Sequence, residues 1–191
     1  NLLLIARDKI ALGELSDELK SNNKISVYYQ SIDLSKPLKI SSGIEDLLNK
    51  GLTPSVLINN AGVGWTGDLL NMDLESWQWV IQMNLTSVFQ VCKCVVPFMR
   101  AKGGLVINVS SHAARNAFPQ WGAYCVSKAA LASFTRCLAE EERANSIRAC
   151  TLTIGSVDTT LWDSESVKGN FDRKLMLSKE QVAKSLLNLA K

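Results

Sequence analysis

The sequence predicts an α/β fold, a doubly wound parallel β-sheet with helices on both faces, three layers in all. Short apolar segments alternate with longer segments whose apolar residues recur at helical spacing, as in parallel strands joined by crossover helices. The short segments are almost continuously apolar, which is typical of strands that helices bury on both sides. A chain of 191 residues can form one sizeable core, so residues 1–191 are predicted to form a single domain.

Each element follows from its local composition. β-Branched and other apolar residues gather in five predicted strands, at residues 2–5, 25–30, 56–59, 105–109 and 147–153. Apolar residues recur every three to four positions in five predicted helices, at residues 8–20, 40–48, 72–99, 122–144 and 178–190. Gly51 is predicted to end the second helix and Asp73 to cap the third. Ser178 and Gln181 have the spacing of a capping box at the start of the last helix.

Charge and hydropathy argue against two classes of partner. A net charge of +3, from 21 basic and 18 acidic residues without a basic block, gives no electrostatic basis for nucleic-acid binding. The longest apolar candidate for a membrane span, Val88–Met99, is too short and contains Lys93 and Pro97. No secretory signal is recognisable before the first predicted strand.

The five cysteines predict a reducing, cytoplasmic environment, because their number is odd and their spacing fits no disulfide framework. Cys92 and Cys94 form a C-x-C pair, but residues two apart on a helix do not share a face. His112 is the only histidine, so a metal site at this pair would lack further ligands. We therefore expect no metal.

Polar and small residues gather directly after the predicted strands. The carboxyl ends of parallel strands share one edge of a doubly wound sheet, and ligands bind at that edge. Each residue alone is equally well explained by the ordinary chemistry of loops, but their joint placement favours a binding site. The residues concerned are Arg7, Asp33, Asn59, Asn60, Ala61, Gly62, Ser110, Ser111, Gly155, Val157 and Thr159.

Tyr124 and Lys128 are four residues apart in a predicted helix, so they share one face. A neighbouring ammonium favours the phenolate and is expected to lower the tyrosine pKa from its usual value of about 10. Such a phenol can exchange protons near neutral pH, with a serine at the end of a neighbouring strand holding the substrate oxygen. Taken alone, the spacing is much better explained by an ordinary helical pair with a solvated lysine.

Taken together, the motifs resemble those of the short-chain dehydrogenase/reductase family. The matching segments, which follow the family's order, are N-N-A-G at 59–62, M-N-L at 83–85, I-N-V-S-S at 107–111, Y-C-V-S-K at 124–128 and G-S-V-D-T at 155–159. The resemblance implies a Rossmann-like fold and an NAD(P)-dependent oxidoreductase that acts on CH–OH or C=O groups. It covers nearly the whole chain.

The resemblance also implies roles for four residues. Ser111, thirteen residues before the tyrosine, would hydrogen-bond the substrate oxygen, with Ser110 in support. Tyr124 would donate or accept the proton, and Lys128 would lower the pKa of Tyr124 and bind the nicotinamide ribose. Asn84 would support a water relay to Lys128. His112, next to Ser111, is either a substrate contact or, as we favour, a loop histidine.

Arg7, just after the first predicted strand, favours NADP(H) over NAD(H). Arg7 suits a 2′-phosphate because a guanidinium forms paired hydrogen bonds to phosphate oxygens. Asp8, which could favour NAD(H), comes one position late and is expected to cap the following helix. Asp33, followed by Leu34, would face the adenine. The complete set of predicted cofactor-binding residues is Arg7, Asp33, Leu34, Asn60, Ala61, Gly62, Tyr124, Lys128, Gly155, Val157 and Thr159.

The chain departs from the family pattern at three points. The family begins with a strand and a T-G-x-x-x-G-I-G turn that holds the pyrophosphate, and no segment here matches them. That strand would lie between the strands at 2–5 and 56–59, so further N-terminal residues are expected in the natural protein. A final strand is also expected to be absent, and Ile154 stands where the family has proline.

The expected substrate is a small carbonyl or alcohol compound with apolar character. Aromatic and other apolar residues flank the tyrosine and populate residues 160–177, where the family has its substrate lid: Phe118, Trp121, Leu161, Trp162, Phe171 and Met176. Core or interface packing explains them equally well. The helices at 72–99 and 122–144 suit an interface, and a homodimer or homotetramer is expected.

Two other functions remain open: a nucleotide-binding sensor or scaffold without catalysis, and a structural subunit of an oligomer. The presence of Asn84, Ser111, Tyr124 and Lys128 together favours the enzyme, because a sensor does not need all four.

Overall fold

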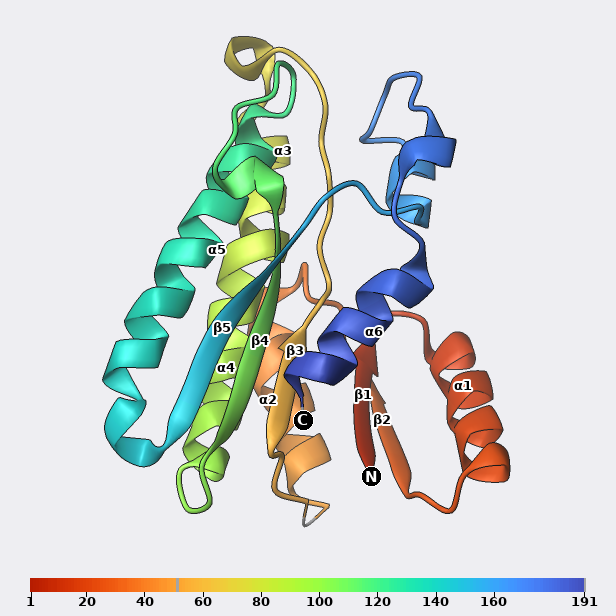
Figure 1. The fold of residues 1–191 in the computed structure, drawn as a ribbon, viewed down its shortest axis with the longest axis vertical. Coiled ribbons are helices and arrows are strands. Elements are labelled where there is room, and N and C mark those ends of the chain that lie inside the picture. Colours follow the sequence, from red (N-terminus) through yellow and green to blue (C-terminus); the bar gives the residue numbers. More distant parts are fainter. Residues whose placement is uncertain (51, 191) are drawn as a thin grey trace.

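The computed structural model describes residues 1–50 and 52–190, which form an α/β fold of alternating strands and helices (Figure 1). The strands are β1 (Leu2–Ala6), β2 (Val27–Ser31), β3 (Val56–Asn59), β4 (Gly104–Ser111) and β5 (Ile147–Ile154). The α-helices are α1 (Lys9–Asn22), α2 (Pro37–Leu48), α3 (Leu74–Ile81), α4 (Ser87–Met99), α5 (Gly122–Glu141) and α6 (Lys179–Leu189). All predicted elements are confirmed, with ends shifted by a few residues; Gly51 lies outside the described residues.

The strands are parallel, as predicted, but they form two separate ladders. β1 pairs with β2, and β4 lies between β3 and β5. Within the described residues β1 and β3 do not pair, and Ile58 on β3 is 42% exposed. The division falls between the strands at residues 2–5 and 56–59, where the family's glycine-turn strand was expected. The pairing of Ser111 with Ile154 aligns the carboxyl ends of β4 and β5.

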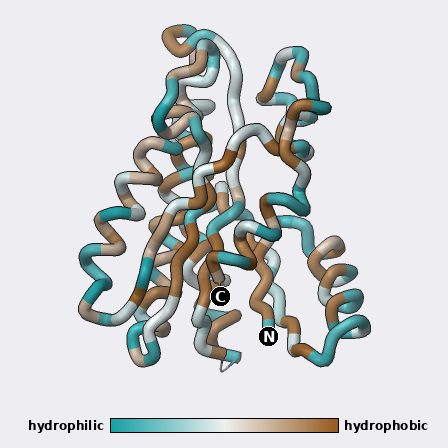
Figure 2. The backbone as a smooth tube through the Cα atoms, in the orientation of Figure 1, coloured by the Kyte–Doolittle hydropathy of each residue, from teal (hydrophilic) through white to brown (hydrophobic). Residues whose placement is uncertain are grey.

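One continuous core lies between the sheet and the helices α2, α4 and α5. In Figure 1, α2 and α4 lie behind the strands and α6 lies in front of them. Ile40 and Ile44 of α2, Met99 of α4 and Leu131 of α5 are almost completely buried in this core. Figure 2 shows hydrophobic residues concentrated along the strands, while polar residues dominate the outer turns of α1 and α5.

The predicted caps form as expected. Asp8 accepts hydrogen bonds from the backbone of Ile10 and Ala11 at the start of α1. Asp73 accepts one from the Ser76 backbone at the start of α3. At α6 the capping box between Ser178 and Gln181 is complete. Each cap satisfies backbone N–H groups that the first helical turn leaves unpaired.

The segment from Leu74 to Met99 is a single helical run, longer than the apolar stretch considered from the sequence. α3 continues through a π-helical turn (Gln82–Thr86) into α4. By length and composition alone this run could cross a membrane, since one window has a mean hydropathy of 1.2. However, 44% of that window is buried in the fold, and α4 contributes its apolar face to the core. The run therefore has the character of a core helix.

Candidate active site

Ser111 and Tyr124 meet at the carboxyl end of β4. Ser111 ends the strand and begins a short 3₁₀ turn, where its hydroxyl accepts a hydrogen bond from Ala113 N at 3.2 Å. Burial raises the pKa of the Tyr124 phenol, and a hydrogen bond with the Ser111 side chain partly offsets this rise. Ser110 points instead into the interior and donates to the backbone carbonyl of Lys128 at 3.3 Å. Of the two candidate serines, Ser111 is therefore the one beside the tyrosine.

Burial dominates the electrostatics of the Tyr124–Lys128 pair. It raises the pKa of Tyr124 above its usual value, against the opposing effect of Ser111. Burial also lowers the pKa of Lys128 to about 8. The Lys128 ammonium donates to the Val109 carbonyl at 3.1 Å and lies 5.7 Å from the centre of the tyrosine ring.

The expected lowering of the Tyr124 pKa by its lysine neighbour is therefore wrong for this arrangement. The low polarity around both side chains disfavours the phenolate and the ammonium alike. The spacing of Tyr124 and Lys128 correctly predicts that they are neighbours, but it carries no information about their burial.

Asn84 lies within the π-helical turn, a rare distortion of α-helices that is frequently found at functional sites. Its side chain is fully buried and is held by the loop after β3 and by α5. Asn84 Nδ2 donates to the Val63 carbonyl at 2.9 Å and to Ser127 Oγ at 3.0 Å, while Oδ1 accepts from Val63 N at 2.8 Å. Ser127 in turn donates to the Tyr124 carbonyl at 2.7 Å. The amide thus ties three segments of the site together.

Gly62 fills the narrow space between Asn84 and Lys128. A Cβ at this position would lie 3.2 Å from Asn84 Oδ1 and 3.3 Å from Lys128 Nζ. A side chain would therefore crowd both groups, so glycine allows the backbone to approach them. The predicted water relay from Asn84 to Lys128 stays a prediction.

A cavity of about 520 Å³ opens between the two ladders. Apolar side chains including Ile5, Ile32 and Ile58 line it, and its rim is polar. Asp33 at this rim accepts hydrogen bonds from the Ser35 side chain and backbone, at 2.7 and 2.9 Å, and these bonds lower its pKa. Six of the predicted cofactor-binding residues line this one cavity: Arg7, Asp33, Leu34, Asn60, Ala61 and Gly62.

Of the remaining predicted cofactor-binding residues, Tyr124 and Lys128 lie on α5, and Gly155, Val157 and Thr159 follow β5. Gly155 lies beside the histidine loop, since a Cβ there would be 3.8 Å from His112 Nδ1. Val157 forms an isolated parallel bridge with Leu177, and its carbonyl accepts a hydrogen bond from Trp162 Nε1 at 2.7 Å. This segment does not line the 520 Å³ cavity. It joins the end of the sheet to residues 160–177.

Aromatic rings surround one side of Tyr124. The Trp121 ring lies edge-on to Tyr124, with 5.4 Å between ring centres. Trp121 also packs against Trp162 at 5.7 Å and Phe171 at 6.1 Å, and these two are 4.6 Å apart. Phe118 packs instead against His112, at 5.0 Å. The aromatic cluster of Trp121, Trp162 and Phe171 forms an apolar wall next to the phenol.

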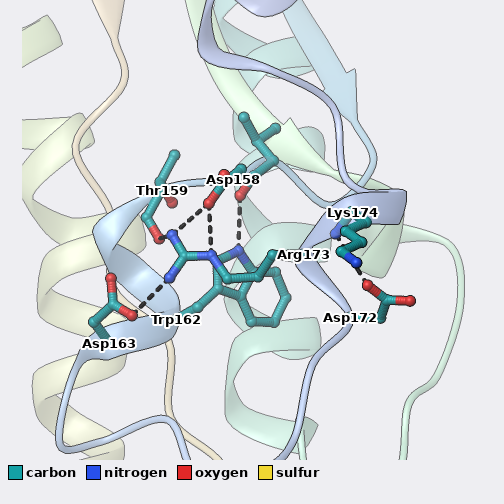
Figure 3. A network of polar contacts seen from close by, with 8 residues as sticks. Asp158, Thr159, Trp162, Asp163, Asp172, Arg173 and Lys174 are labelled. Carbon is teal, nitrogen blue, oxygen red and sulfur yellow. Dashed lines mark hydrogen bonds and ion pairs between the residues drawn. The ribbon is translucent and has the colours of Figure 1, made fainter.

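Sequence reasoning missed two residues that organise the site. Ser127 connects Asn84 to the tyrosine backbone, but a serine on a helix gives no signal of such a bridge. Arg173 binds Asp158, Asp163 and the Thr159 carbonyl, as Figure 3 shows. The available signal in the sequence was that Arg173 and its acidic partners, Asp158 and Asp163, stand near one another along the chain.

Comparisons with known proteins agree with this fold. The chain is 30% identical over 189 residues to the 3-oxoacyl-[acyl-carrier-protein] reductase FabG of Chlamydia muridarum, covering 95% of this chain and 75% of that protein. It is 31% identical over 160 residues to an NADP-dependent 3-hydroxy acid dehydrogenase of Schizosaccharomyces pombe, covering 83% and 62% of the two chains. An alcohol dehydrogenase from Thermococcus sibiricus, solved with 5-hydroxy-NADP, superimposes with a TM-score of 0.88 at 25% identity, over 98% and 78% of the chains.

The parallel sheet, its cavity and these matches define the class: a Rossmann-like oxidoreductase. The family model for short chain dehydrogenases matches residues 1–169. The chain belongs to this family and is an NAD(P)-dependent dehydrogenase or reductase.

Proposed function

We propose that this protein transfers a hydride between NADP(H) and a carbonyl or secondary alcohol, with Tyr124 as the general acid or base. The observation that carries the proposal is that the Tyr124 side chain lies beside Ser111, with its ring centre 5.7 Å from the ammonium of the buried Lys128. It combines a proton-carrying phenol with a hydroxyl able to hold a substrate oxygen.

The residues present fit a nicotinamide nucleotide. Gly62 leaves the room that a close backbone approach needs, and the cavity beside it has a polar rim and apolar walls. Arg7 would bind a 2′-phosphate, whereas Asp8 is already committed to capping α1. The Schizosaccharomyces pombe and Thermococcus sibiricus proteins, an NADP-dependent enzyme and a complex with 5-hydroxy-NADP, support NADP(H). When bound, this nucleotide would supply or accept the hydride.

The roles of the side chains follow from their protonation. A tyrosine phenol, with its usual pKa of about 10, is protonated at neutral pH, so Tyr124 can act as an acid toward a carbonyl oxygen. Burial raises this pKa further and so makes the proton harder to release. Ser111 would donate a hydrogen bond to the same oxygen. In reduction the phenolic proton moves to that oxygen, and the phenolate is then reprotonated from the side of Lys128. Asn84 would position the loop at Gly62 and support the water relay toward Lys128.

The aromatic wall supports a substrate of apolar character. Trp121 is the closest of its rings to Tyr124, and Trp162 and Phe171 extend the apolar surface away from the phenol. A flat or aliphatic group beside the carbonyl would bury apolar area against these rings.

The proposal is tested in the full-length protein by following NADPH oxidation with a panel of ketones and aldehydes. Tyr124→Phe should reduce kcat by at least about a hundredfold, because it removes the proton donor. Tyr29→Phe on β2 is the matched control and should keep wild-type activity. No turnover with any carbonyl, or equal activity of Tyr124→Phe and wild type, would overturn the proposal. Nucleotide binding without turnover would favour a sensor.

We also propose a homodimer or homotetramer in the cytoplasm. Phe89 and Phe98 on α4 and Val126 on α5 are each nearly half exposed, which supports an interface between copies. The five free cysteines support a reducing compartment. Light scattering coupled to size exclusion would report the mass, and a monomer at micromolar concentration would contradict the proposed assembly.

A further inference from the structure

Arg173 is the centre of a polar network on the lid segment, residues 160–177 (Figure 3). Its Nε donates to Asp158 Oδ1 at 2.6 Å, and its Nη1 donates to Asp163 Oδ1 at 2.7 Å. Nη2 donates to the Thr159 carbonyl at 3.1 Å and also contacts the Asp158 carboxylate. All three nitrogens of the guanidinium are therefore engaged, and its planar fork fixes the direction of each bond.

The partners of Arg173 belong to two different parts of the site. Asp158 and Thr159 lie in the segment after β5 that is predicted to bind the cofactor. Asp163 ends the first turn of the lid, next to Trp162 of the aromatic wall. Arg173 itself follows Phe171, another member of that wall, by two residues. One side chain thus connects the predicted cofactor segment to the apolar wall beside Tyr124.

Further hydrogen bonds hold the cofactor segment against the same lid. Asp158 N donates to the Leu177 carbonyl and Leu177 N donates to the Ser156 carbonyl, both at 2.9 Å. Trp162 Nε1 donates to the Val157 carbonyl at 2.7 Å. Lid residues therefore contact every position from Ser156 to Thr159. The position of this segment therefore depends on its contacts with residues 160–177.

The solvent exposure of these ion pairs indicates that they affect the local arrangement of the lid more than the stability of the whole fold. The side chains of Arg173, Asp158 and Asp163 are 38%, 50% and 57% exposed. Ion pairs this open to solvent contribute little to global stability. Without the guanidinium, however, two carboxylates would remain close together with no cation between them. Loss of Arg173 should therefore disturb the local arrangement much more than the overall fold.

We propose that Arg173 is a positioning residue that holds residues 156–159 and the aromatic wall in one fixed relation, so that nucleotide binding and formation of the apolar substrate site are coupled. This inference rests on the proposed function. It assigns Arg173 no contact with substrate or nucleotide, since its effect passes through Asp158, Thr159 and Trp162.

The experiment compares Arg173→Ala, Arg173→Lys and Arg143→Ala in the full-length protein. Arg143 forms an ion pair with Glu140 at the C-terminal end of α5, and their side chains are 74% and 69% exposed. Arg143→Ala therefore serves as the matched control. NADPH affinity is measured by isothermal titration calorimetry without substrate. Amide hydrogen exchange is measured for residues 156–177 and, as a reference, for β4. The KM and kcat for an apolar carbonyl are measured separately.

Arg173→Ala should raise the NADPH dissociation constant and the carbonyl KM by about five- to twentyfold each, a usual range for coupling between sites. Exchange at residues 156–163 should accelerate while exchange in β4 stays unchanged. Arg173→Lys should restore only part of the affinity, because one ammonium cannot reproduce the fork. Arg143→Ala should match wild type in every measurement.

Two results would overturn the inference: wild-type NADPH affinity in Arg173→Ala, or an affinity loss accompanied by faster exchange in β4 as well. Calorimetry and exchange do not depend on turnover. If Arg173→Ala shows the expected changes in a protein without carbonyl reduction, the positioning role stands and the proposed catalysis fails. If the protein reduces carbonyls and Arg173→Ala matches wild type, the proposed catalysis stands and this inference fails.

Discussion

Asn84 holds the backbone of Val63 from both sides: Oδ1 accepts the Val63 N–H at 2.8 Å and Nδ2 donates to the Val63 carbonyl at 2.9 Å. This double contact fixes the loop after β3, whose Gly62 approaches both Asn84 and Lys128. The loop also lines the cavity between the ladders. The geometry of the proposed nucleotide site therefore depends on one buried amide in a π-helical turn.

Asn84→Ala should destabilise the protein by about 2 kcal/mol, because it leaves the partly buried Val63 N–H and carbonyl without these partners. Asn84→Asp should recover only part of this loss, since a carboxylate can accept from Val63 N but cannot donate to the Val63 carbonyl. Urea unfolding of both variants measures the change. Asn188→Ala on the exposed side of α6 is the control and should lie within about 0.5 kcal/mol of wild type. An Asn84→Ala variant as stable as that control would contradict the assignment.

Lys128 should make the protein more stable as the pH rises from about 8 to 10. Its pKa is lowered from 10.5 to about 8 in the folded state, so the unfolded chain binds more protons in this interval and unfolding becomes less favourable. The full shift corresponds to about 3 kcal/mol. Above pH 10 the raised pKa of Tyr124 acts in the opposite direction, because the unfolded phenol releases its proton first.

Unfolding free energies of wild type, Lys128→Met and Lys93→Met across this interval test the prediction. Lys93 is exposed on α4, so Lys93→Met should keep the rise, whereas Lys128→Met should lose it. A rise that persists in Lys128→Met would show that another group causes it.

Local patterns were sufficient to predict most of the fold. Apolar periodicity and capping residues such as Asp73 and Ser178 depend on neighbours a few positions away, so the sequence contains their full cause. The sheet is divided between β1 and β3, the place that the family resemblance gives to its glycine-turn strand. The choice of Ser111 over Ser110 came from the family resemblance, which implies a serine thirteen residues before the tyrosine. In the fold, Ser111 lies beside Tyr124, whereas Ser110 donates to the Lys128 carbonyl.

The sequence could not predict properties that arise from distant contacts. The pKa of Tyr124 depends on burial, which no local pattern specifies. The two hydrogen bonds between Asn84 and Val63 join a π-helical turn to a loop that lies 21 residues away in the sequence. Arg173 collects its partners from across the lid. In each case the determining neighbour is brought close only by the tertiary fold.

The ion pair between Arg100 and Glu142, at the C-terminal ends of α4 and α5, should contribute measurably to stability. Arg100 Nη2 and Nε donate to the two Glu142 oxygens at 2.6 and 3.0 Å, and Asn145 Nδ2 donates to Oε2 at 2.8 Å. The Glu142 side chain is only 7% exposed, so Arg100→Met would leave a buried carboxylate without its cation. We expect a loss of about 2 kcal/mol, moderated by the 50% exposure of the arginine.

The pH dependence of the unfolding free energy provides a second test of the pair between Arg100 and Glu142. The hydrogen bond from Arg100 lowers the pKa of Glu142, so its contribution is present near neutrality and is lost as the pH falls through the folded pKa. Wild type and Arg100→Met should therefore converge in stability under acid. Arg143→Ala, which breaks an exposed pair, should stay within about 0.5 kcal/mol of wild type at every pH. Parallel acid curves for wild type and Arg100→Met would rule out this account.

Trp121 should decide how strongly the enzyme prefers apolar carbonyl substrates. Its ring packs edge-on against Tyr124 and joins the tyrosine to Trp162 and Phe171. Trp121→Ala should raise KM for a bulky apolar ketone by about tenfold, the usual effect of losing one apolar contact. The KM for a small hydroxylated ketone should change little, since such a substrate gains little from the wall. Trp121→Phe, which keeps an aromatic ring, should retain most of the preference. An equal rise in KM for both ketones would contradict this role of Trp121. It would show that Trp121 only packs the lid, because a displaced lid would disturb Tyr124 for every carbonyl substrate alike.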